Sequence, residues 1–319
     1  MKAITQSGNA LVWKDVPDLS PRAGEVLVRV RAAGVNRADL SQRAGQYPPP
    51  PGASEILGLE VAGRVAELGP EVAGVGVGDE VCALLAGGGY AEYAVVPAGV
   101  LMPIPRGWTV EAAGGLPEVF LTAHLNLFEV AGLKPGEAVL IHGGASGVGT
   151  AAIQLAREAG CRVFATAGTD EKVRACTELG ATAFNYRAVD FVAAVQGHTA
   201  GVEVVLDMVG QGYLAQNLEL LDTGGRLVVI ATLSGSAAQL ELRALMTKRL
   251  SIIGSTLRSR PLGEKVALVR SFQARFWEAL EAGRLKPVMD GVFDIRDAEA
   301  AHERMRGNLN IGKIVLRVP

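Results

Sequence analysis

Residues 139–156 read VLIHGGASGVGTAAIQLA and join an apolar run to a cluster of glycines and then to a stretch with helical periodicity. Strand, glycine-rich turn and helix in this order are typical of the first unit of a dinucleotide-binding sheet. There the glycines allow a tight turn, a close approach of the backbone to a pyrophosphate, and close packing of helix on strand. The start of the helix adds unsatisfied N–H groups and the positive end of its dipole. The stretch therefore predicts a dinucleotide site.

Two registers of the glycine fingerprint fit this turn. One begins at Gly144 and continues with Ser146 and Gly149, so its middle glycine is missing. The other consists of Gly147, Gly149 and Ala152 and lies later in the turn. Ser146 can donate a hydrogen bond to phosphate, and it can equally cap the helix. A glycine-rich turn without a ligand is the alternative. The predicted cofactor contacts in this turn are Gly144, Ser146, Gly147, Val148 and Gly149.

The segments that follow alternate between apolar runs and helical patterns up to about residue 260. Predicted strands read RVFATAG, EVVLDMVG, RLVVIATL and LSIIGST, and predicted helices over 148–159 and 170–179 are each followed by a glycine. Runs such as VLI, VVL and LVVI are apolar on both faces, as strands of a covered parallel sheet must be. We therefore predict an α/β fold with a doubly wound parallel sheet over residues 122–260, in which LSIIGST is an edge strand.

The first 120 residues or so have a different sequence pattern. GEVLVRVRAAGVN, ILGLEVAGRVAELG and VGDEVCALLAGGGYAEYAVV are strand-like and separated by turn residues, which predicts an antiparallel barrel or sandwich with few helices. After residue 260 come a long helix (264–282), a shorter one (297–305) and a lone final strand, GKIVLRV. That strand needs partners, and the N-terminal sheet is the expected host. The parallel sheet is then an insertion into a split domain of residues 1–121 and 261–319.

Composition bounds the functional class. The chain has 319 residues, of which 49% are apolar and 20% charged, and 31 Lys and Arg against 33 Asp and Glu leave a formal charge of −2. This balance does not favour a nucleic-acid or anionic-membrane surface. No apolar run approaches the ~18 residues that a span requires, and three cysteines, Cys82, Cys161 and Cys176, do not make a disulfide framework. A cytoplasmic enzyme without nucleic-acid or membrane partners is expected.

The end of the second predicted strand indicates which dinucleotide fits. An NAD site usually places Asp or Glu about 20 residues after the glycines to bind the ribose 2′-OH. Here the position is Ala167, and neither it nor Gly168 is acidic, so nothing there repels a 2′-phosphate. Thr169 can donate a hydrogen bond and Lys172 can supply positive charge, although an exposed helical lysine is the plain alternative for Lys172. The pattern favours NADPH over NADH.

The motifs, taken together, resemble a known superfamily over essentially the whole chain. AAGVNRADL, GLEVAGRV, VGDEV, LTA, SGVGTAAIQLA, FNY and NIGKIVL resemble the medium-chain dehydrogenases/reductases. Within them the chain is similar to the zinc-independent quinone oxidoreductases of the ζ-crystallin type, and VNRADLSQRAGQYPPPPGAS looks like the tumour-suppressor-inducible subgroup. The resemblance implies a Rossmann sheet inserted into a GroES-like, mainly β barrel domain, and a homodimer built through the edge strand.

Alcohol dehydrogenases of that superfamily carry a catalytic zinc, but the ligand positions differ here. Asn36 replaces a cysteine, Leu59 replaces the histidine of a His-Glu pair and precedes Glu60, and Glu118 replaces a further cysteine. The four clustered cysteines of the structural zinc site are also missing, with only Cys82 in that region. A zinc site needs thiolate, imidazole or carboxylate ligands in closed geometry. We therefore expect no metal.

Without a Lewis acid, hydride transfer needs an acceptor that is already electrophilic, such as a quinone or an α,β-unsaturated carbonyl. The sequence thus predicts an NADPH-dependent quinone oxidoreductase. A 2-enal or enoyl-thioester reductase would use the same kind of active site. An NADPH-binding protein with a mainly non-catalytic role is the alternative that is not an enzyme. The four histidines, at 124, 142, 198 and 302, show no paired spacing and are expected to pack in the core or on the surface.

Candidate catalytic residues are Asn36, Tyr47 and Thr122. The Asn36 amide can donate to a carbonyl oxygen, or the residue can cap the next helix. The resemblance places Tyr47, which precedes four prolines, and Thr122 beside the nicotinamide; a surface tyrosine and a helix N-cap are the alternatives. It also places Tyr186 beside the 2′-phosphate. The remaining cofactor contacts are expected at Gly168, Thr169, Lys172, Gly210, Leu257 and Arg258, of which Arg258 could instead be a plain surface charge.

Overall fold

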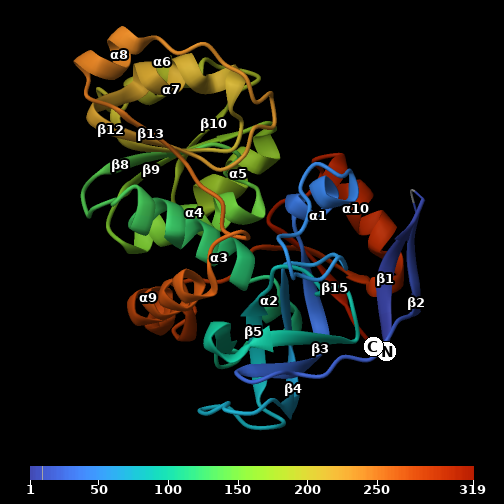
Figure 1. The fold of residues 1–319 in the computed structure, drawn as a ribbon. Helices are drawn as coiled ribbons and strands as arrows, with labels where there is room; N and C mark the ends of the chain where they lie inside the picture. Colours follow the sequence, from blue (N-terminus) through green and yellow to red (C-terminus); the bar gives the residue numbers. More distant parts are fainter. Residues whose placement is uncertain (9) are drawn as a thin grey trace. The chain divides into compact units, whose positions relative to one another are not determined.

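The computed structural model describes residues 1–8 and 10–319 and divides the chain into two compact units. The first comprises Met1–Leu121 together with Arg258–Pro319, and the second comprises Thr122–Leu257. The N-terminal and C-terminal segments, blue and red in Figure 1, thus belong to the same unit. The sequence analysis placed the boundaries after residues 121 and 260, and the structure places them after 121 and 257.

The second unit is built on a six-stranded parallel sheet with the order β10-β9-β8-β11-β12-β13. The strands are β8 (Ala138–Ile141), β9 (Arg162–Ala167), β10 (Thr182–Asn185), β11 (Val202–Asp207), β12 (Leu221–Val229) and β13 (Ser251–Gly254). The chain starts in the middle at β8, winds outward to β10, and then returns to β11 on the other side. This confirms the doubly wound sheet, and β13 is an edge strand as predicted.

Helices connect these strands. They are α4 (Gly147–Glu158), α5 (Asp170–Glu178), α6 (Phe191–Gln196), α7 (Leu214–Leu220) and α8 (Leu242–Thr247), with a short 3₁₀ turn, η3 (Gln211–Tyr213), before α7. Gly160 and Gly180, which follow α4 and α5, have φ of 77° and 99°, the left-handed conformation that ends a helix. β10 and α6 were not predicted from the sequence, because TAFN is short and half-buried and FVAAVQ is only six residues long.

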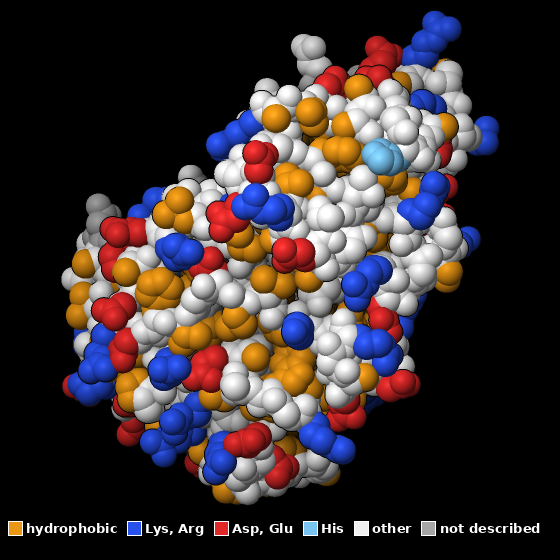
Figure 2. Space-filling view, turned by 180° about the vertical axis from the view of Figure 1, so that it is seen from behind, with side chains coloured by type: hydrophobic (Ala, Val, Ile, Leu, Met, Phe, Trp, Pro, Cys, Tyr) orange, Lys and Arg blue, Asp and Glu red, His pale blue; other side chains and the backbone are white. Residues whose placement is uncertain are grey.

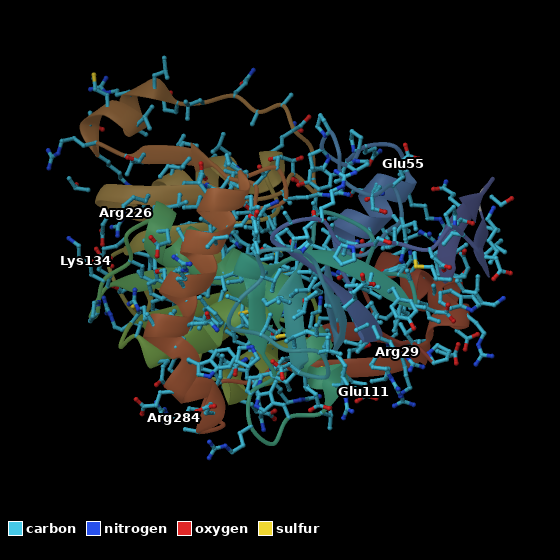
Figure 3. All side chains as sticks on the ribbon, turned by 60° about the horizontal axis from the view of Figure 1, so that its bottom comes forward. Arg29, Glu55, Glu111, Lys134, Arg226 and Arg284 are labelled. Atoms are coloured by element: carbon cyan, nitrogen blue, oxygen red, sulfur yellow. The ribbon has the colours of Figure 1, made fainter. Side chains whose placement is uncertain are left out.

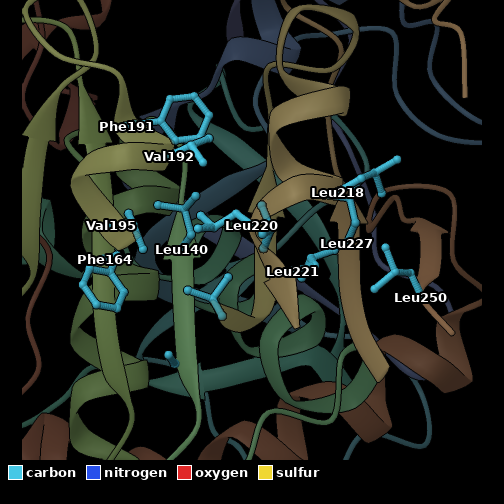
Figure 4. Close-up of a cluster of buried hydrophobic side chains, with 13 residues drawn as sticks. Leu140, Phe164, Phe191, Val192, Val195, Leu218, Leu220, Leu221, Leu227 and Leu250 are labelled. Carbon is cyan, nitrogen blue, oxygen red and sulfur yellow. The ribbon is translucent and has the colours of Figure 1, made fainter. Parts of the chain in front are cut away.

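An apolar core lies between one face of this sheet and helices α6 and α7. Figure 4 shows Leu140, Phe164 and Leu227 on the strands facing Val195 and Leu218 on the helices, and all five are at least 95% buried. Each such side chain stabilises the fold by roughly 1.5–3 kcal/mol relative to an exposed one. The core fixes the sheet, and therefore fixes the positions of the loops at the carboxyl ends of its strands.

The first unit contains a seven-stranded sheet with the order β14-β15-β3-β4-β5-β7, to which β6 adds by pairing with β3. Its strands are β3 (Glu25–Val35), β4 (Glu60–Leu68), β5 (Glu80–Leu84), β6 (Tyr93–Pro97), β7 (Leu101–Pro103), β14 (Met289–Asp294) and β15 (Lys313–Arg317); β1 (Lys2–Ser7) and β2 (Ala10–Asp15) form a separate pair. β15 pairs antiparallel with β3, which confirms the N-terminal sheet as its host.

The final strand is not alone, however. β14 pairs with β15 in parallel, and it was not predicted because MDGVFD is half-buried and has no apolar run.

The helices of this unit are α1 (Arg37–Arg43), α2 (Val110–Gly114), α9 (Leu262–Glu281) and α10 (Ala298–Arg306), with 3₁₀ turns η1 (Ala98–Val100) and η4 (Ile295–Asp297). Helix α3 (Pro117–His124) runs across the unit boundary into a π-helical turn, η2 (Leu125–Val130).

β3 is the centre of the first unit, because it pairs with β15, β4 and β6. Val26, Val28 and Val30 are fully buried, while Arg29 and Arg31 are exposed, as their alternation predicts. Figure 3 shows Arg29 at the periphery of the side-chain mass.

The surface carries charges of both signs. On the face drawn in Figure 2, Lys and Arg side chains are interspersed with Asp and Glu. Among the described residues, no helix combines the length and the apolar character that a membrane span would require.

Candidate functional site

The glycine turn of the second unit connects β8 to α4. Ser146 is the N-cap of α4, and its Oγ accepts a hydrogen bond from the Gly149 N–H at 3.0 Å, which confirms the capping role. A Cβ on Gly149 would lie 2.3 Å from the Gly143 carbonyl oxygen, and one on Gly144 would lie 2.8 Å from Cβ of Ala165. Both glycines are therefore required for close packing, which favours the register Gly144, Ser146, Gly149. Gly143 was not among the predicted residues, yet its left-handed backbone, with a φ of 61°, forms the turn.

This turn lies at the topological switch point, where β8 is flanked by β9 on one side and β11 on the other. Open α/β sheets bind their ligands in the crevice beyond the carboxyl ends of the strands at such a point. The first N–H groups of α4, from Gly147 and Val148 onward, lack intrahelical acceptors because they begin the helix. The turn thus offers a cradle for a pyrophosphate, and a side chain on Gly149 would disrupt it.

The loops after β9 and β10 bring together the residues predicted to select the dinucleotide. A Cβ on Gly168 would lie 2.7 Å from the Tyr186 hydroxyl oxygen, so only a glycine lets the tyrosine lie against this loop. Thr169 caps α5, with its Oγ1 accepting from the Lys172 N–H at 3.3 Å. Lys172 itself lies in the first turn of α5, and its side chain is half-buried.

Two further charged residues at this edge escaped the sequence analysis. The exposed Arg187 guanidinium lies 5.9 Å from the centre of the Tyr186 ring and adds a cation next to that tyrosine. Asp170, in the first turn of α5, adds an acid, and its Oδ1 accepts from Asn185 Nδ2 at 2.7 Å. Arg187 could have been predicted from the sequence, because a basic residue directly follows the FNY motif.

Beyond β11, Gly210 has a φ of 83°, and its N–H donates to the Asp207 carboxylate at 3.2 Å. Asp207 also accepts from Asn217 Nδ2, and Asn217 Oδ1 is bonded to His142 Nε2 at 2.7 Å. Burial lowers the pKa of His142 to about 4, so the imidazole is neutral at pH 7. This buried network holds together the ends of β8 and β11, which matches the packing role predicted for His142.

Two predicted contacts lie at the limits of the second unit. Thr122 lies inside α3 rather than before it, so the alternative that it is a helix N-cap is wrong. Its carbonyl oxygen accepts from Asn126 Nδ2 at 2.7 Å, and its side chain is half-buried. Leu257, the last residue of the unit, is 5% exposed.

In the first unit, a buried lysine lies at the centre of a polar cluster. Lys313 is 2% exposed, and its Nζ donates to Glu60 Oε1 at 2.5 Å, to Asn36 Oδ1 at 2.9 Å and to the Val35 carbonyl at 3.0 Å. Glu60 is fully buried and also accepts from Asn36 Nδ2 at 2.8 Å. A Cβ on Gly34 would lie 2.2 Å from Glu60 Oε1, so a glycine in β3 makes the space for this carboxylate.

Asn36 serves both as a cap and as part of this cluster. It occupies the N-cap position of α1, and its backbone N–H donates to Asp39 Oδ2 at 2.8 Å, which confirms the predicted cap. Its amide nitrogen donates to Glu60 Oε1 and, at 3.4 Å, to the Gly34 carbonyl oxygen. Because both amide hydrogens have acceptors inside the protein, Asn36 holds Glu60 and Lys313 in place rather than pointing a free donor at a substrate.

A second buried acid lies next to this cluster. Asp39 is fully buried and accepts from the N–H groups of Asn36 and Gly58 and, at 3.2 Å, from the Tyr90 hydroxyl. Burial raises the pKa of the Asp39 carboxyl to about 6. Tyr90 is also bonded to His302 Nε2 at 3.1 Å, and burial lowers the pKa of His302 to about 4. The sequence analysis missed this network, although an acid three residues after an N-cap is a known capping pattern.

Tyr47 and Arg258 interact within the first unit. The Arg258 guanidinium lies 5.4 Å from the centre of the Tyr47 ring and donates to the Tyr47 carbonyl, to Gln42 Oε1 and to the Ala86 carbonyl. Arg258 is 3% exposed, so the alternative that it is a plain surface charge is wrong. It belongs to the unit of Tyr47 and not to the parallel sheet, because the boundary falls after residue 257. Burial raises the pKa of the Tyr47 hydroxyl.

The positions that hold zinc in the superfamily's alcohol dehydrogenases converge here, but their side chains do not suit a metal. Asn36 offers an amide already bonded to Lys313, Leu59 is a buried apolar residue, and Glu118 has only a carboxylate to offer. The neighbouring Glu60 is neutralised by the Lys313 ammonium. Across residues 1–8 and 10–319, no group of three His, Cys, Asp or Glu side chains could hold a metal ion. This donor set does not fit zinc, and we derive no step through a metal.

Comparison with known proteins assigns these features to a class. Residues 147–273 match the family described as Zinc-binding dehydrogenase, and residues 22–106 match the Alcohol dehydrogenase GroES-like domain. Quinone oxidoreductase of Sus scrofa is 35% identical over 295 residues, 91% of this chain and 87% of the relative. Quinone oxidoreductase of Homo sapiens is 32% identical over 303 residues, 93% of this chain and 90% of the relative.

Solved structures agree over the full length. A mycobacterial protein complexed with NADPH has a TM-score of 0.88 at 29% identity, covering 99% of this chain and 100% of that chain. The CurK enoyl reductase has a TM-score of 0.87 at 29% identity, covering 100% and 98%. An NAD-dependent alcohol dehydrogenase has a TM-score of 0.86 at 32% identity, covering 100% of both chains.

These findings define an oxidoreductase fold in which a Rossmann parallel sheet, which binds NAD(P), is inserted into a GroES-like domain. The chain belongs to the medium-chain dehydrogenase/reductase superfamily, and quinone oxidoreductases are among its relatives.

Proposed function

We propose that the protein is an NADPH-dependent quinone oxidoreductase that reduces quinones, and other conjugated carbonyls, without a metal ion. The observation that carries the proposal is the buried Lys313 ammonium, bonded to both Asn36 and Glu60. An ammonium balances the Glu60 charge, but it has no empty orbital to coordinate an oxygen as a Lewis acid does. The acceptor must then be electrophilic by itself, and a quinone or enone is, because the incoming charge delocalises to oxygen.

NADPH supplies the hydride when it is bound. The turn from Gly143 to Gly149 and the N-terminus of α4 would hold its pyrophosphate. Gly168, Thr169 and Tyr186 would receive the adenosine end, with Lys172 and Arg187 neutralising the 2′-phosphate. We assign Gly210 and Leu257 to the cofactor as well. Tyr47 and Thr122 remain our candidates for contacts near the nicotinamide, and Arg258 positions Tyr47 by lying over its ring.

The function is tested with a set of acceptors. We expect NADPH oxidation with 9,10-phenanthrenequinone to be faster than with an alkenal or a crotonyl thioester, and unaffected by a metal chelator. A preference for the thioester would instead support an enoyl-thioester reductase, a second candidate that the similarity to the CurK enoyl reductase favours. Tight NADPH binding with no turnover of any acceptor would support a mainly non-catalytic binding role.

Preference for the phosphorylated cofactor depends on the two cations after β9 and β10. We expect Lys172→Ala and Arg187→Ala each to raise the dissociation constant of NADPH roughly tenfold, because each removes a charge-assisted hydrogen bond to the 2′-phosphate. The affinity for NADH should not change. Arg174→Ala is the matched control, since Arg174 lies two residues beyond Lys172 on α5 and is exposed. Fluorescence titration with both cofactors measures this, and equal affinities of the wild type for NADPH and NADH would contradict it.

We further propose a homodimer formed through β13. This edge strand exposes Ile252 at 37%, and the neighbouring helix α8 exposes Leu242 at 66% and Met246 at 71%. An apolar edge of this kind favours pairing with a second copy. Light scattering after size-exclusion chromatography should give a dimer for the wild type and a monomer for Ile252→Asp; a monomeric wild type would refute the proposal.

A further inference from the structure

Two glutamates of the first unit, the fully buried Glu60 and the half-buried Glu118, adjoin each other but have different environments. The Glu118 N–H donates to Glu60 Oε2 at 2.9 Å, so the two residues adjoin. Glu60 also receives the Lys313 ammonium and the Asn36 amide, both on its Oε1. Every hydrogen bond to Glu60 is of the kind that stabilises a carboxylate, and an ammonium balances its charge. The hydrogen bonds and the counter-charge that suit a carboxylate are therefore all at Glu60.

The environment of the Glu118 carboxyl differs from that of Glu60. It is in the first turn of α3, and its Oε2 is buried with no hydrogen-bond partner among the described residues. The Glu60 carboxylate and, more weakly, the Asp39 carboxyl repel a negative charge there, while Lys313 and Lys265 attract one. Burial is the largest effect, and it raises the pKa of the Glu118 carboxyl to about 8. At pH 7 this side chain holds a proton and has an oxygen free to form a bond.

Glu118 also acts electrostatically on two residues of the proposed site. Burial first, and the Glu118 charge second, raise the pKa of the Tyr47 hydroxyl. Burial lowers the pKa of the Arg258 guanidinium, and the Glu118 charge opposes that fall. The other buried acids and bases of this unit are less suited to give up a proton. Asp39 accepts three hydrogen bonds, and the Tyr90 hydroxyl is already bonded to both Asp39 and His302.

We propose that Glu118 is the acid that delivers the proton in acceptor reduction. The inference rests on the proposed function. Bound NADPH would supply a hydride to the conjugated acceptor, and the electron pair of that hydride would place a negative charge on the acceptor oxygen. The O–H bond of Glu118 then breaks, a new O–H bond forms on that oxygen, and Glu118 becomes a carboxylate. A proton from solvent restores it, so the net reaction consumes one proton for each hydride.

The kinetic test compares Glu118→Gln with Glu118→Asp and with Glu67→Gln. Glu67 lies on the same strand as Glu60 and is exposed, which makes it the matched control. We expect Glu118→Gln to lower kcat roughly a hundredfold, the usual contribution of a general acid, and to abolish the fall in the wild-type rate above about pH 8. Glu118→Asp should retain part of the rate and of the pH profile. An active wild type matched in rate and profile by Glu118→Gln would overturn the inference.

Two readouts do not depend on turnover. The infrared spectrum of the wild type at pH 7 should contain a protonated-carboxyl band that Glu118→Gln lacks. The folded state should also hold this proton while the unfolded state loses it, so that wild-type stability falls relative to Glu118→Gln as the pH rises from 4.5 to about 8. If neither appears, Glu118 is not protonated and the inference fails.

The outcomes separate this inference from the proposed function. A wild type that binds NADPH but reduces no acceptor would overturn the proposed function and the donor role together. A wild type that reduces quinones, with a Glu118→Gln variant that binds NADPH normally and loses only the proton-dependent rate, would support both.

Discussion

Replacing Lys313 with methionine should lower the free energy of unfolding of the first unit by about 3–5 kcal/mol, because it leaves the Glu60 carboxylate buried without a counter-charge. The side chains of both residues are at most 2% exposed, so solvent cannot take over the role of the ammonium. The fall should be seen by denaturant unfolding followed by tryptophan fluorescence, which reports on this unit alone because Trp13, Trp108 and Trp277 all belong to it.

Two further variants test whether the loss of stability comes from the unpaired Glu60 charge. Lys14→Met removes an exposed lysine of the same unit and should change stability by less than about 0.5 kcal/mol. Adding Glu60→Gln to Lys313→Met removes the unpaired charge and should recover most of the loss. If Lys313→Met alone were as stable as the wild type, the ammonium would not balance Glu60, and our proposal of a reaction without a metal ion would lose its support.

Replacing Gly149 with valine should weaken NADPH binding about a hundredfold and destabilise the second unit by about 1–3 kcal/mol. The first atom of the side chain would lie 2.3 Å from the Gly143 carbonyl oxygen and 2.7 Å from Cα of Gly144, so either the turn or α4 must move. That movement would displace the N–H groups that would hold the pyrophosphate. Calorimetry and cofactor titration measure the two effects.

The control for this variant is Gly263→Ala. Gly263 lies in the first turn of α9, has an ordinary φ, and would place its Cβ in open space. Exchanging glycine for alanine in a helix gains up to about 1 kcal/mol, so this control should be neutral or slightly stabilising. If Gly149→Val bound NADPH as tightly as the wild type, the turn would not be the phosphate site.

Local patterns were enough to predict most of the second unit. The doubly wound sheet, its edge strand and the start of α4 follow from apolar runs, glycine spacing and helix stop signals, all set by neighbouring residues. β10 and β14 were missed because their own residues carry no such local pattern. Each is short and half-buried, and each exists because a neighbouring strand supplies the hydrogen bonds, information that is absent from the segment itself.

The candidate site was predicted unevenly. Ser146 and Asn36 were expected as caps, and both are, because capping depends on residues one to three positions away. The Asn36 amide was also expected to donate to a substrate, but in the folded protein it donates to Glu60 and Gly34, which lie on strands β4 and β3. Arg258 was assigned to the parallel sheet and lies instead against Tyr47, 211 residues away in the chain.

The sequence by itself determined the alternation of strands and helices, the glycine turn between β8 and α4, and the absence of cysteine and histidine from the positions compared with zinc ligands. Only the tertiary structure showed that the Lys313 ammonium binds both Asn36 and Glu60, and that Glu118 adjoins Glu60. The reason is physical. Periodicity and capping depend on neighbours along the chain, whereas the protonation of a buried carboxyl depends on charges that long-range folding brings within a few ångströms.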